Sequence, residues 1–247
     1  MTNSPLPLGI DVSNYQGAIN WMQVADDGVE FAGIKATEGI AFHDGYFANN
    51  WAQAKVYNIP RIAYHYAKPD YSAANDEATY FIDYILNNGG IDEGDILALD
   101  MEEGTGDLSG WTQFFVEVVE SLVGFKPLLY SRKNFIEEHN LNTPELAACG
   151  LWLASYSDRF PATLLPWPNI AFWQYSNAGR IPGITGDVDL NRFNGTVNRI
   201  PLYGKPKDTP APLPQLEIKT RLNELLAQTD ALLRALKALR DDVANQQ

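Results

Sequence analysis

The segment DILALDMEEGTG, residues 95–106, carries an apolar run directly into three carboxylates, Asp100, Glu102 and Glu103. The run predicts a buried strand. Because side chains alternate along a strand, Asp100 and Glu102 point to one face, while Glu103 points away or begins the loop. Crowding two acids raises the pKa of one of them, which leaves a proton donor beside an ionised partner at neutral pH. Glycoside hydrolysis requires this division of labour.

Further carboxylates lie in other strand-like segments. Asp11 ends the first apolar run, and Asp187 and Asp189 lie in the last one. In a barrel of parallel strands, chemistry takes place at the carboxyl ends of the strands. We therefore expect Asp11, Asp100 and Glu102 to meet an aspartate of the last segment at one rim. From the residues alone, such a rim could instead bind Mg²⁺ or Mn²⁺, so a metal-dependent phosphodiesterase that loses activity in EDTA is an alternative.

Aromatic and amide side chains accompany the carboxylates at the predicted strand ends. Tyr64 and Tyr66 share a strand face, and Gln174 lies between two rings of a later strand. Rings pack against the apolar faces of sugars and amides bond to hydroxyl groups, although a single ring more often belongs to the core. The predicted substrate contacts are Lys35, Glu38, Tyr64, Tyr66, Tyr130, Trp152, Tyr156, Trp173, Gln174 and Tyr175.

The elements that must position these residues alternate between strands and helices. We expect strands at residues 8–13, 31–37, 61–67, 96–102, 126–131, 150–156, 170–176 and 187–193. We expect helices at residues 19–28, 46–58, 72–89, 109–124 and 132–140. This alternation predicts an α/β barrel with a parallel sheet, and the last third of the barrel carries more strand than helix.

Composition excludes several classes of function. The net charge is −13, and residues 1–203 carry 25 acidic against 11 basic side chains. An acidic body without a basic stripe repels phosphate backbones, so we expect no nucleic-acid partner. The single cysteine, Cys149, forms no internal disulfide, and the three histidines show no metal-ligand spacing. We expect neither a metal nor a cofactor, since there is also no glycine-rich phosphate loop.

No apolar run approaches the roughly 18 residues of a membrane span, and the first residues lack the features of a signal peptide. We therefore expect no membrane insertion, and export by another route.

The C-terminal part of the chain has a different pattern. Residues 1–203 form the predicted barrel, and residues 204–215 contain four prolines, which predicts an extended linker. Residues 216–247 show a heptad pattern of apolar residues, which predicts a coiled-coil helix that makes the protein a homo-oligomer. Leu226 and Leu233 widen the apolar face, which favours a trimer, a tetramer or docking on another surface. A helix folded back on its own barrel is the alternative.

Seven motifs together resemble the family 25 glycoside hydrolases, the Chalaropsis-type lysozymes, many of which are phage endolysins or bacterial autolysins. In chain order they are GIDVSNYQGAINW, GIKATEG, AYHYA, LALDMEEG, LWLASY, FWQYS and GDVDLNRF. The resemblance covers residues 8 to about 203 and does not reach the tail. It implies a flattened, irregular TIM-like barrel with about five β/α units followed by three β-strands, and no need for a metal.

The resemblance also implies roles for individual residues. Glu102 is similar to the proton donor, and Asp100 to the residue that acts as nucleophile or orients the 2-acetamido group of the substrate. Asp11 and Asp189 complete an acidic ring that supports an oxocarbenium-like transition state. Asp189 aligns better than its rival Asp187. Lys35, Glu38, Tyr64, Gln174 and Tyr175 resemble substrate-lining positions.

By the same resemblance, the expected substrate is the β-1,4 bond between N-acetylmuramic acid and N-acetylglucosamine in peptidoglycan. Such an enzyme fits phage-mediated lysis, in which the protein waits in the host cytoplasm for a holin or travels in the virion. The alternative from another class is a non-catalytic protein that binds the cell wall or serves in virion assembly.

Overall fold

The computed structural model describes residues 5–207, 225, 227–229 and 231–237. By internal contacts the chain divides into two units, Met1–Pro210 and Ala211–Gln247. The first unit holds the barrel and all of the expected site residues.

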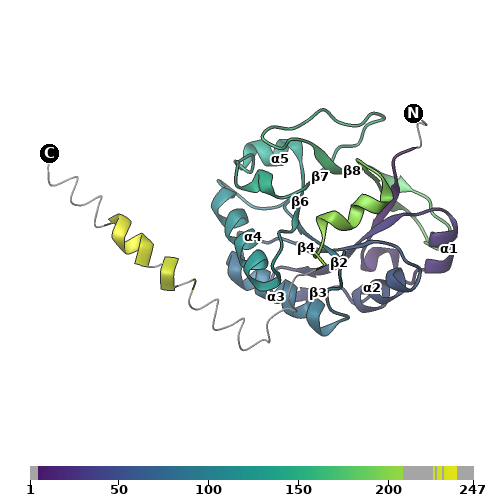
Figure 1. Ribbon diagram of the computed structural model, residues 1–247, viewed down its shortest axis with the longest axis horizontal. Coiled ribbons are helices and arrows are strands. Elements are labelled where there is room, and N and C mark those ends of the chain that lie inside the picture. The colour runs from purple at the N-terminus through teal and green to yellow at the C-terminus, as the bar shows by residue number, and fades with distance from the viewer. Residues whose placement is uncertain (1–4, 208–224, 226, 230, 238–247) are drawn as a thin grey trace. The chain divides into compact units, whose positions relative to one another are not determined.

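Nine strands, β1 to β9, form one sheet within the described residues, and helices cover it from outside (Figure 1). The strands are β1 Leu8–Val12, β2 Phe31–Glu38, β3 Phe42–His43, β4 Arg61–Tyr66, β5 Ile96–Asp100, β6 Leu128–Arg132, β7 Leu151–Ala154, β8 Ile170–Gly179 and β9 Val188–Phe193. The α-helices of this unit are α1 Trp21–Asp26, α2 Phe47–Val56, α3 Ala74–Asn87, α4 Ser109–Val123 and α5 Lys133–Glu138. Short 3-10 helices span Asn14–Gln16 (η1), Leu146–Ala148 (η2) and Val197–Tyr203 (η3).

Eight of these strands close into a barrel, because β1 pairs with both β2 and β9. The pairings from β1 through β2, β4, β5, β6 and β7 to β8 are parallel. Strand β9 runs antiparallel to both of its neighbours, β8 and β1. This closure brings the first and last strands together and sets Asp11 directly opposite Asp189.

The α/β barrel predicted from the sequence is confirmed, with every expected strand and helix present. Strand β3 was not expected. It is two residues long and forms a hairpin with the end of β2, where Thr37 pairs with His43 and Glu38 with Phe42. So short a segment gives no period-2 pattern to detect.

Aromatic side chains fill the barrel, and two glycines make room for them. A Cβ on Gly33 of β2 would lie 2.6 Å from the Trp152 ring and 2.9 Å from the Cβ of Asp11. A Cβ on Gly9 of β1 would lie 2.3 Å from the ring of Phe31. Real Cβ contacts are never this short, so β1 and β2 need glycine where large rings cross the interior.

The amino-terminal end of the barrel serves stability. Arg61, the first residue of β4, is buried and donates to both carboxylate oxygens of Asp95 at 2.7 Å. It also donates to Asp92 at 2.8 Å and to the carbonyl of Trp51 at 2.6 Å. A buried guanidinium requires such complete pairing, because an uncompensated buried charge is strongly destabilising.

The body keeps contacts slightly beyond residue 203. Lys205 donates its N–H to the carbonyl of Asp95 at 2.8 Å, and its ammonium donates to the carbonyl of Ile91 at 2.9 Å. Residues 208–215 of the expected linker lie outside the described residues.

In the second unit, residues 225, 227–229 and 231–237 are helical. Leu232, Leu233 and Leu236 are exposed there. The other positions of the expected coiled coil lie outside the described residues. Among the helices that the structure describes, none combines the length and the apolar character needed to cross a membrane.

Candidate active site

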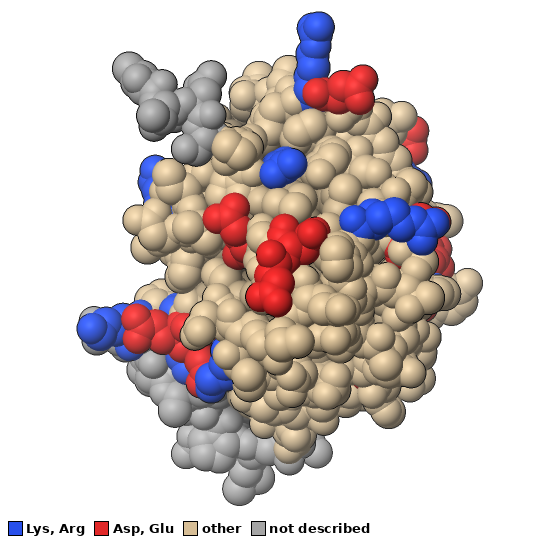
Figure 2. Space-filling view, turned by 90° about the vertical axis from the view of Figure 1, so that its right-hand side faces the viewer, with Lys and Arg blue, Asp and Glu red and all other residues tan. Residues whose placement is uncertain are grey.

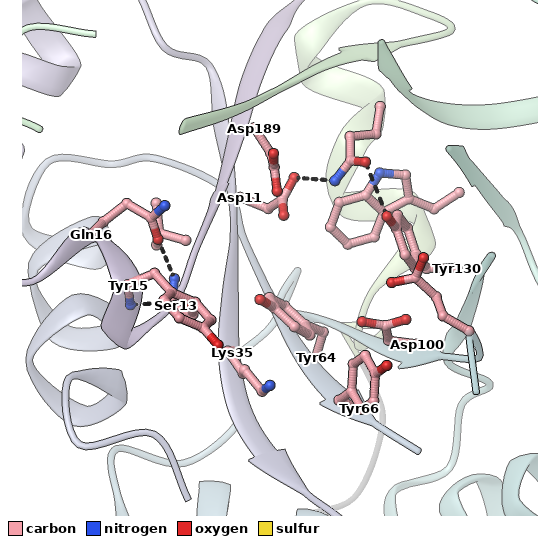
Figure 3. A pocket seen from close by; sticks show the side chains of 14 residues that line it. Asp11, Ser13, Tyr15, Gln16, Lys35, Tyr64, Tyr66, Asp100, Tyr130 and Asp189 are labelled. Atoms are coloured by element: carbon pink, nitrogen blue, oxygen red, sulfur yellow. Dashed lines mark hydrogen bonds between the residues drawn. The ribbon is translucent and has the colours of Figure 1, made fainter. Parts of the chain in front are cut away.

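A cavity of about 210 Å³ opens at the carboxyl ends of the barrel strands (Figure 3). Its lining includes ten of the residues expected from the sequence: Asp11, Lys35, Tyr64, Tyr66, Asp100, Glu102, Tyr130, Trp152, Gln174 and Asp189. Val12, Ser13, Tyr15 and Gln16 complete the lining. All four acids of the expected rim therefore lie in one small cavity.

Asp100 and Glu102 form a hydrogen-bonded carboxyl pair. Asp100 ends β5 and is only 6% exposed, and its Oδ1 has no partner among the described residues. Burial, followed by the charge of Glu102, raises the pKa of Asp100 well above its ordinary value. Burial also raises the pKa of Glu102, although the nearby guanidinium of Arg132 opposes this effect. Because the charge of each carboxyl group changes the titration of the other, the pair titrates as a unit.

Asp11 and Asp189 form a second carboxyl pair across the seam between β1 and β9, visible in Figure 3. Burial raises the pKa of Asp11. Burial and the negative charge of Asp11 raise the pKa of Asp189 to about 8. With a pKa of about 8, Asp189 keeps its proton at neutral pH. Asp187 lies outside the cavity, where its exposed carboxylate pairs with Arg180 at 3.0 Å.

Gln174 holds Asp11 from the β8 side. Its Nε2 donates to Oδ2 of Asp11 at 3.0 Å. Its Oε1 accepts hydrogen bonds from the hydroxyls of Tyr130 at 3.0 Å and Tyr156 at 3.1 Å. Because both hydroxyls bond to the amide oxygen, the NH₂ group can only face the carboxylate.

Asn191 performs the same task from β9, and sequence reasoning missed it. Its Nδ2 donates to Oδ2 of Asp11 at 2.7 Å, and its Oδ1 accepts from the indole nitrogen of Trp152 at 2.7 Å. Asn191 follows Asp189 by two residues, so strand alternation places both on one face. Counting in steps of two from Asp189 could have found it.

Lys35 is the basic residue of the lining. Its ammonium bonds to Glu38 at 2.7 Å and lies 4.8 Å from the centre of the Tyr66 ring. Its positive charge opposes the rise in the pKa of Asp100. Burial, followed by the charges of Asp11 and Asp100, raises the pKa of the Tyr64 hydroxyl well above its ordinary value.

Four of the expected substrate contacts lie outside the lining: Glu38, Tyr156, Trp173 and Tyr175. Glu38 reaches the site through Lys35, and Tyr156 through Gln174. Trp173 and Tyr175 contact each other with ring centres 5.3 Å apart. Alternation along β8 points Gln174 inward and its two neighbours outward. A substrate contact by these two rings stays a prediction that this geometry does not support.

The unexpected part of the lining is the 3-10 turn η1 that follows β1. The hydroxyl of Ser13 accepts from the N–H of Tyr15 at 3.3 Å, and the N–H of Ser13 donates to Oε1 of Gln16 at 2.9 Å. These reciprocal bonds cap the turn and fix its entry. Tyr15 is 87% exposed at the mouth of the cavity. The segment SNYQG, residues 13–17, was the available signal.

The carboxyl groups of the cavity favour a neutral or cationic ligand. Figure 2 shows carboxylates gathered near the centre of one face, with basic side chains scattered around them. Within the described part of the chain, no group of three or more His, Cys, Asp or Glu side chains is arranged to hold a metal ion. The cavity offers two carboxyl pairs with raised pKa values, rings and fixed amides, which suit acid catalysis on a sugar chain.

Comparison with known proteins gives a consistent result. The model of glycosyl hydrolases family 25 matches residues 10–184. Lysozyme M1 of Streptomyces globisporus is 33% identical over 206 residues, which cover 78% of this chain and 69% of that protein. A bacterial lysozyme from Streptomyces coelicolor has a TM-score of 0.75 at 31% identity, with 82% of this chain and 99% of that one covered. The CTP1L endolysin has a TM-score of 0.70 at 27% identity, and the match covers 80% of this chain and 70% of that one.

The raised pKa of Asp189 predicts a pH-dependent cost to stability. In the unfolded chain the carboxyl titrates near 3.9, and in the folded protein near 8. The folded state therefore holds the proton more tightly, and stability is lost as pH rises between these values. We expect the Tm of Asp189→Asn, measured by calorimetry, to exceed that of the wild type by a margin that grows from pH 4 to pH 8.

Asp187→Asn is the matched control, because it makes the same change at an exposed carboxyl group outside the cavity. A constant margin for Asp189→Asn over the same range would show that another group carries the titration.

Proposed function

This chain belongs to glycosyl hydrolase family 25 and is a lysozyme that hydrolyses peptidoglycan; from the geometry of its cavity we propose how it does so. The bond cleaved is the β-1,4 linkage between N-acetylmuramic acid and N-acetylglucosamine. The observation that supports this proposal most is the pair of Asp100 and Glu102 in the cavity, where burial raises the pKa of both carboxyl groups. Because the substrate is a sugar chain and needs no metal or redox group, carboxyl chemistry is sufficient.

Exposure separates the roles of the two acids. Glu102 exposes 27% of its side chain, so it can reach the leaving oxygen of the substrate and protonate it. Asp100 is buried and keeps an unpaired Oδ1. When an N–H or a developing positive charge of the substrate meets that oxygen, the ionised form of Asp100 is favoured and a proton moves to Glu102. Substrate binding thus prepares the acid.

Asp100 and Asp11 then supply negative charge to the oxocarbenium-like transition state. Asp100 acts directly as nucleophile or by orienting the 2-acetamido group of the sugar. Asp11 is fixed by two amide donors and therefore needs no rearrangement as positive charge develops. Asp189 keeps its proton and supports Asp11.

Glu102→Gln tests the acid. We expect turnover to fall by about 10²–10⁴-fold, because glutamine cannot donate the proton, while binding to intact cell walls is retained. Turnover is measured by mass spectrometry of soluble fragments released from purified peptidoglycan, after borohydride labelling of their reducing ends. Muramitol ends would identify cleavage after N-acetylmuramic acid, as proposed. Glucosaminitol ends would show that the enzyme cleaves after N-acetylglucosamine instead.

Glu117→Gln is the control, since Glu117 is an exposed residue of α4 far from the lining of the cavity. Unchanged lysis by Glu102→Gln would exclude Glu102 as the acid. If the wild type releases no fragments from several types of cell wall, the alternative of a non-catalytic wall-binding or assembly protein is favoured.

We further propose that residues 216–247 join several catalytic units into a homo-oligomer. The support is the heptad pattern and the exposed Leu232, Leu233 and Leu236. Weak contacts of several units with an insoluble polymer would add through effective concentration. Truncation after Lys207 keeps both bonds of Lys205 to the body, so we expect a folded monomer. Light scattering checks this, and a full-length monomer would refute the proposed assembly.

The biological setting that we propose is phage-mediated lysis, with the protein held in the host cytoplasm until a holin releases it or carried in the virion. Likeness to the CTP1L endolysin supports this setting. We expect cells that express the chain to keep their turbidity until a holin is co-expressed, and then to lyse. Lysis that is equally fast without a holin would contradict release by this route.

A further inference from the structure

A second cavity, of about 380 Å³, opens beside the catalytic one. Its walls are the β2–β3 hairpin, residues 38–42, the loop of residues 68–72 and Glu103. None of the activity described above uses it.

Ion pairs connect the linings of the two cavities. The ring of Tyr66, which lines the catalytic cavity, lies 4.8 Å from the ammonium group of Lys35 and 4.9 Å from that of Lys68, measured to the ring centre. Lys68 pairs with Glu103 at 2.6 Å and with Glu38 at 3.2 Å, and Glu38 pairs with Lys35 at 2.7 Å. A chain-like ligand that leaves the catalytic cavity past Tyr66 therefore meets the second cavity next.

Apolar surface is exposed around this cavity. Tyr71 is 80% exposed, Ile40 50% and Phe42 40%. Aromatic rings beside charged groups match a saccharide, whose apolar ring face packs on the aromatic ring while its hydroxyl and amide groups bond to the ions. The charges of the network, Lys35 and Lys68 against Glu38 and Glu103, cancel, so the network does not attract a charged peptide.

The exposed ring of Tyr71 stands on an ordered turn. The N–H groups of Tyr71 and Ser72 donate to the carbonyl of Lys68 at 2.9 and 3.2 Å. The buried carboxylate of Glu77 accepts from the N–H of Lys68 at 3.0 Å and from the hydroxyl of Ser72. Because the backbone that carries the ring is fixed, little backbone entropy is lost when a ligand binds to the ring.

We propose that the second cavity is a saccharide subsite that binds the glycan strand beyond the residues held in the catalytic cavity. Tyr71 and Phe42 supply the stacking surface, and the ion network of Lys68 supplies polar contacts. The subsite rests on the proposed function, since it extends the same substrate. It makes the enzyme prefer long glycan strands to short ones.

Tyr71→Ala in the full-length chain tests the subsite. We expect the ratio of kcat/KM for long to short glycan fragments to fall about tenfold, and Phe42→Ala to act in the same direction. The control is Tyr46→Ala, since Tyr46 is 38% exposed and lies in neither cavity. An unchanged ratio, or equal losses on long and short fragments, would overturn the subsite.

Binding gives a readout that does not need turnover. Calorimetry is carried out on the Glu102→Gln background with long and short glycan fragments, both free of stem peptides and carrying them. Adding Tyr71→Ala should weaken the binding of the long peptide-free fragments. This result tests the subsite even if the wild type releases no fragments from peptidoglycan. A failure to release fragments would count against the proposed function alone. If binding is weakened only for fragments that carry stem peptides, the cavity binds peptide, and the proposed saccharide subsite is wrong.

Discussion

Four carboxyl groups share one small cavity, and they cannot all be ionised at once. The protein pairs them, Asp100 with Glu102 and Asp11 with Asp189, so that burial and the neighbouring charge raise the pKa within each pair. Other parts of the site follow from the same constraint. Lys35 offsets part of the remaining negative charge, and fixed amides hold the ionised Asp11. Crowding therefore produces the acid and the anion from residues of one type.

The barrel seam makes this crowding possible. Asp11 and Asp189 are far apart in the sequence, and they meet because β9 enters the sheet antiparallel between β1 and β8. The opposite end of the barrel carries the fully paired Arg61 and takes no part in the site. Chemistry and stabilisation thus occupy separate ends of the same strands, as is usual for barrels of this class.

Sequence patterns predicted what depends on local order. The apolar run before Asp100 marked β5, and the spacing of two placed Glu102 beside it. Sequence patterns did not predict the contacts that depend on pairing between distant strands. The orientation of the Asn191 amide follows from Trp152, a residue of another strand, and no local pattern contains that contact. Trp173 was expected at the substrate because it lies at a strand end, yet alternation from Gln174 turns it outward.

Gly33 links the packing of the barrel to its chemistry. The space where its side chain would be is filled by Trp152, whose indole orients Asn191, which in turn holds Asp11. A single methyl group added there would push against both the tryptophan ring and the aspartate. A change at a residue that has no functional group therefore disturbs the catalytic acids, and a screen for folded but inactive variants would return Gly33 together with those acids.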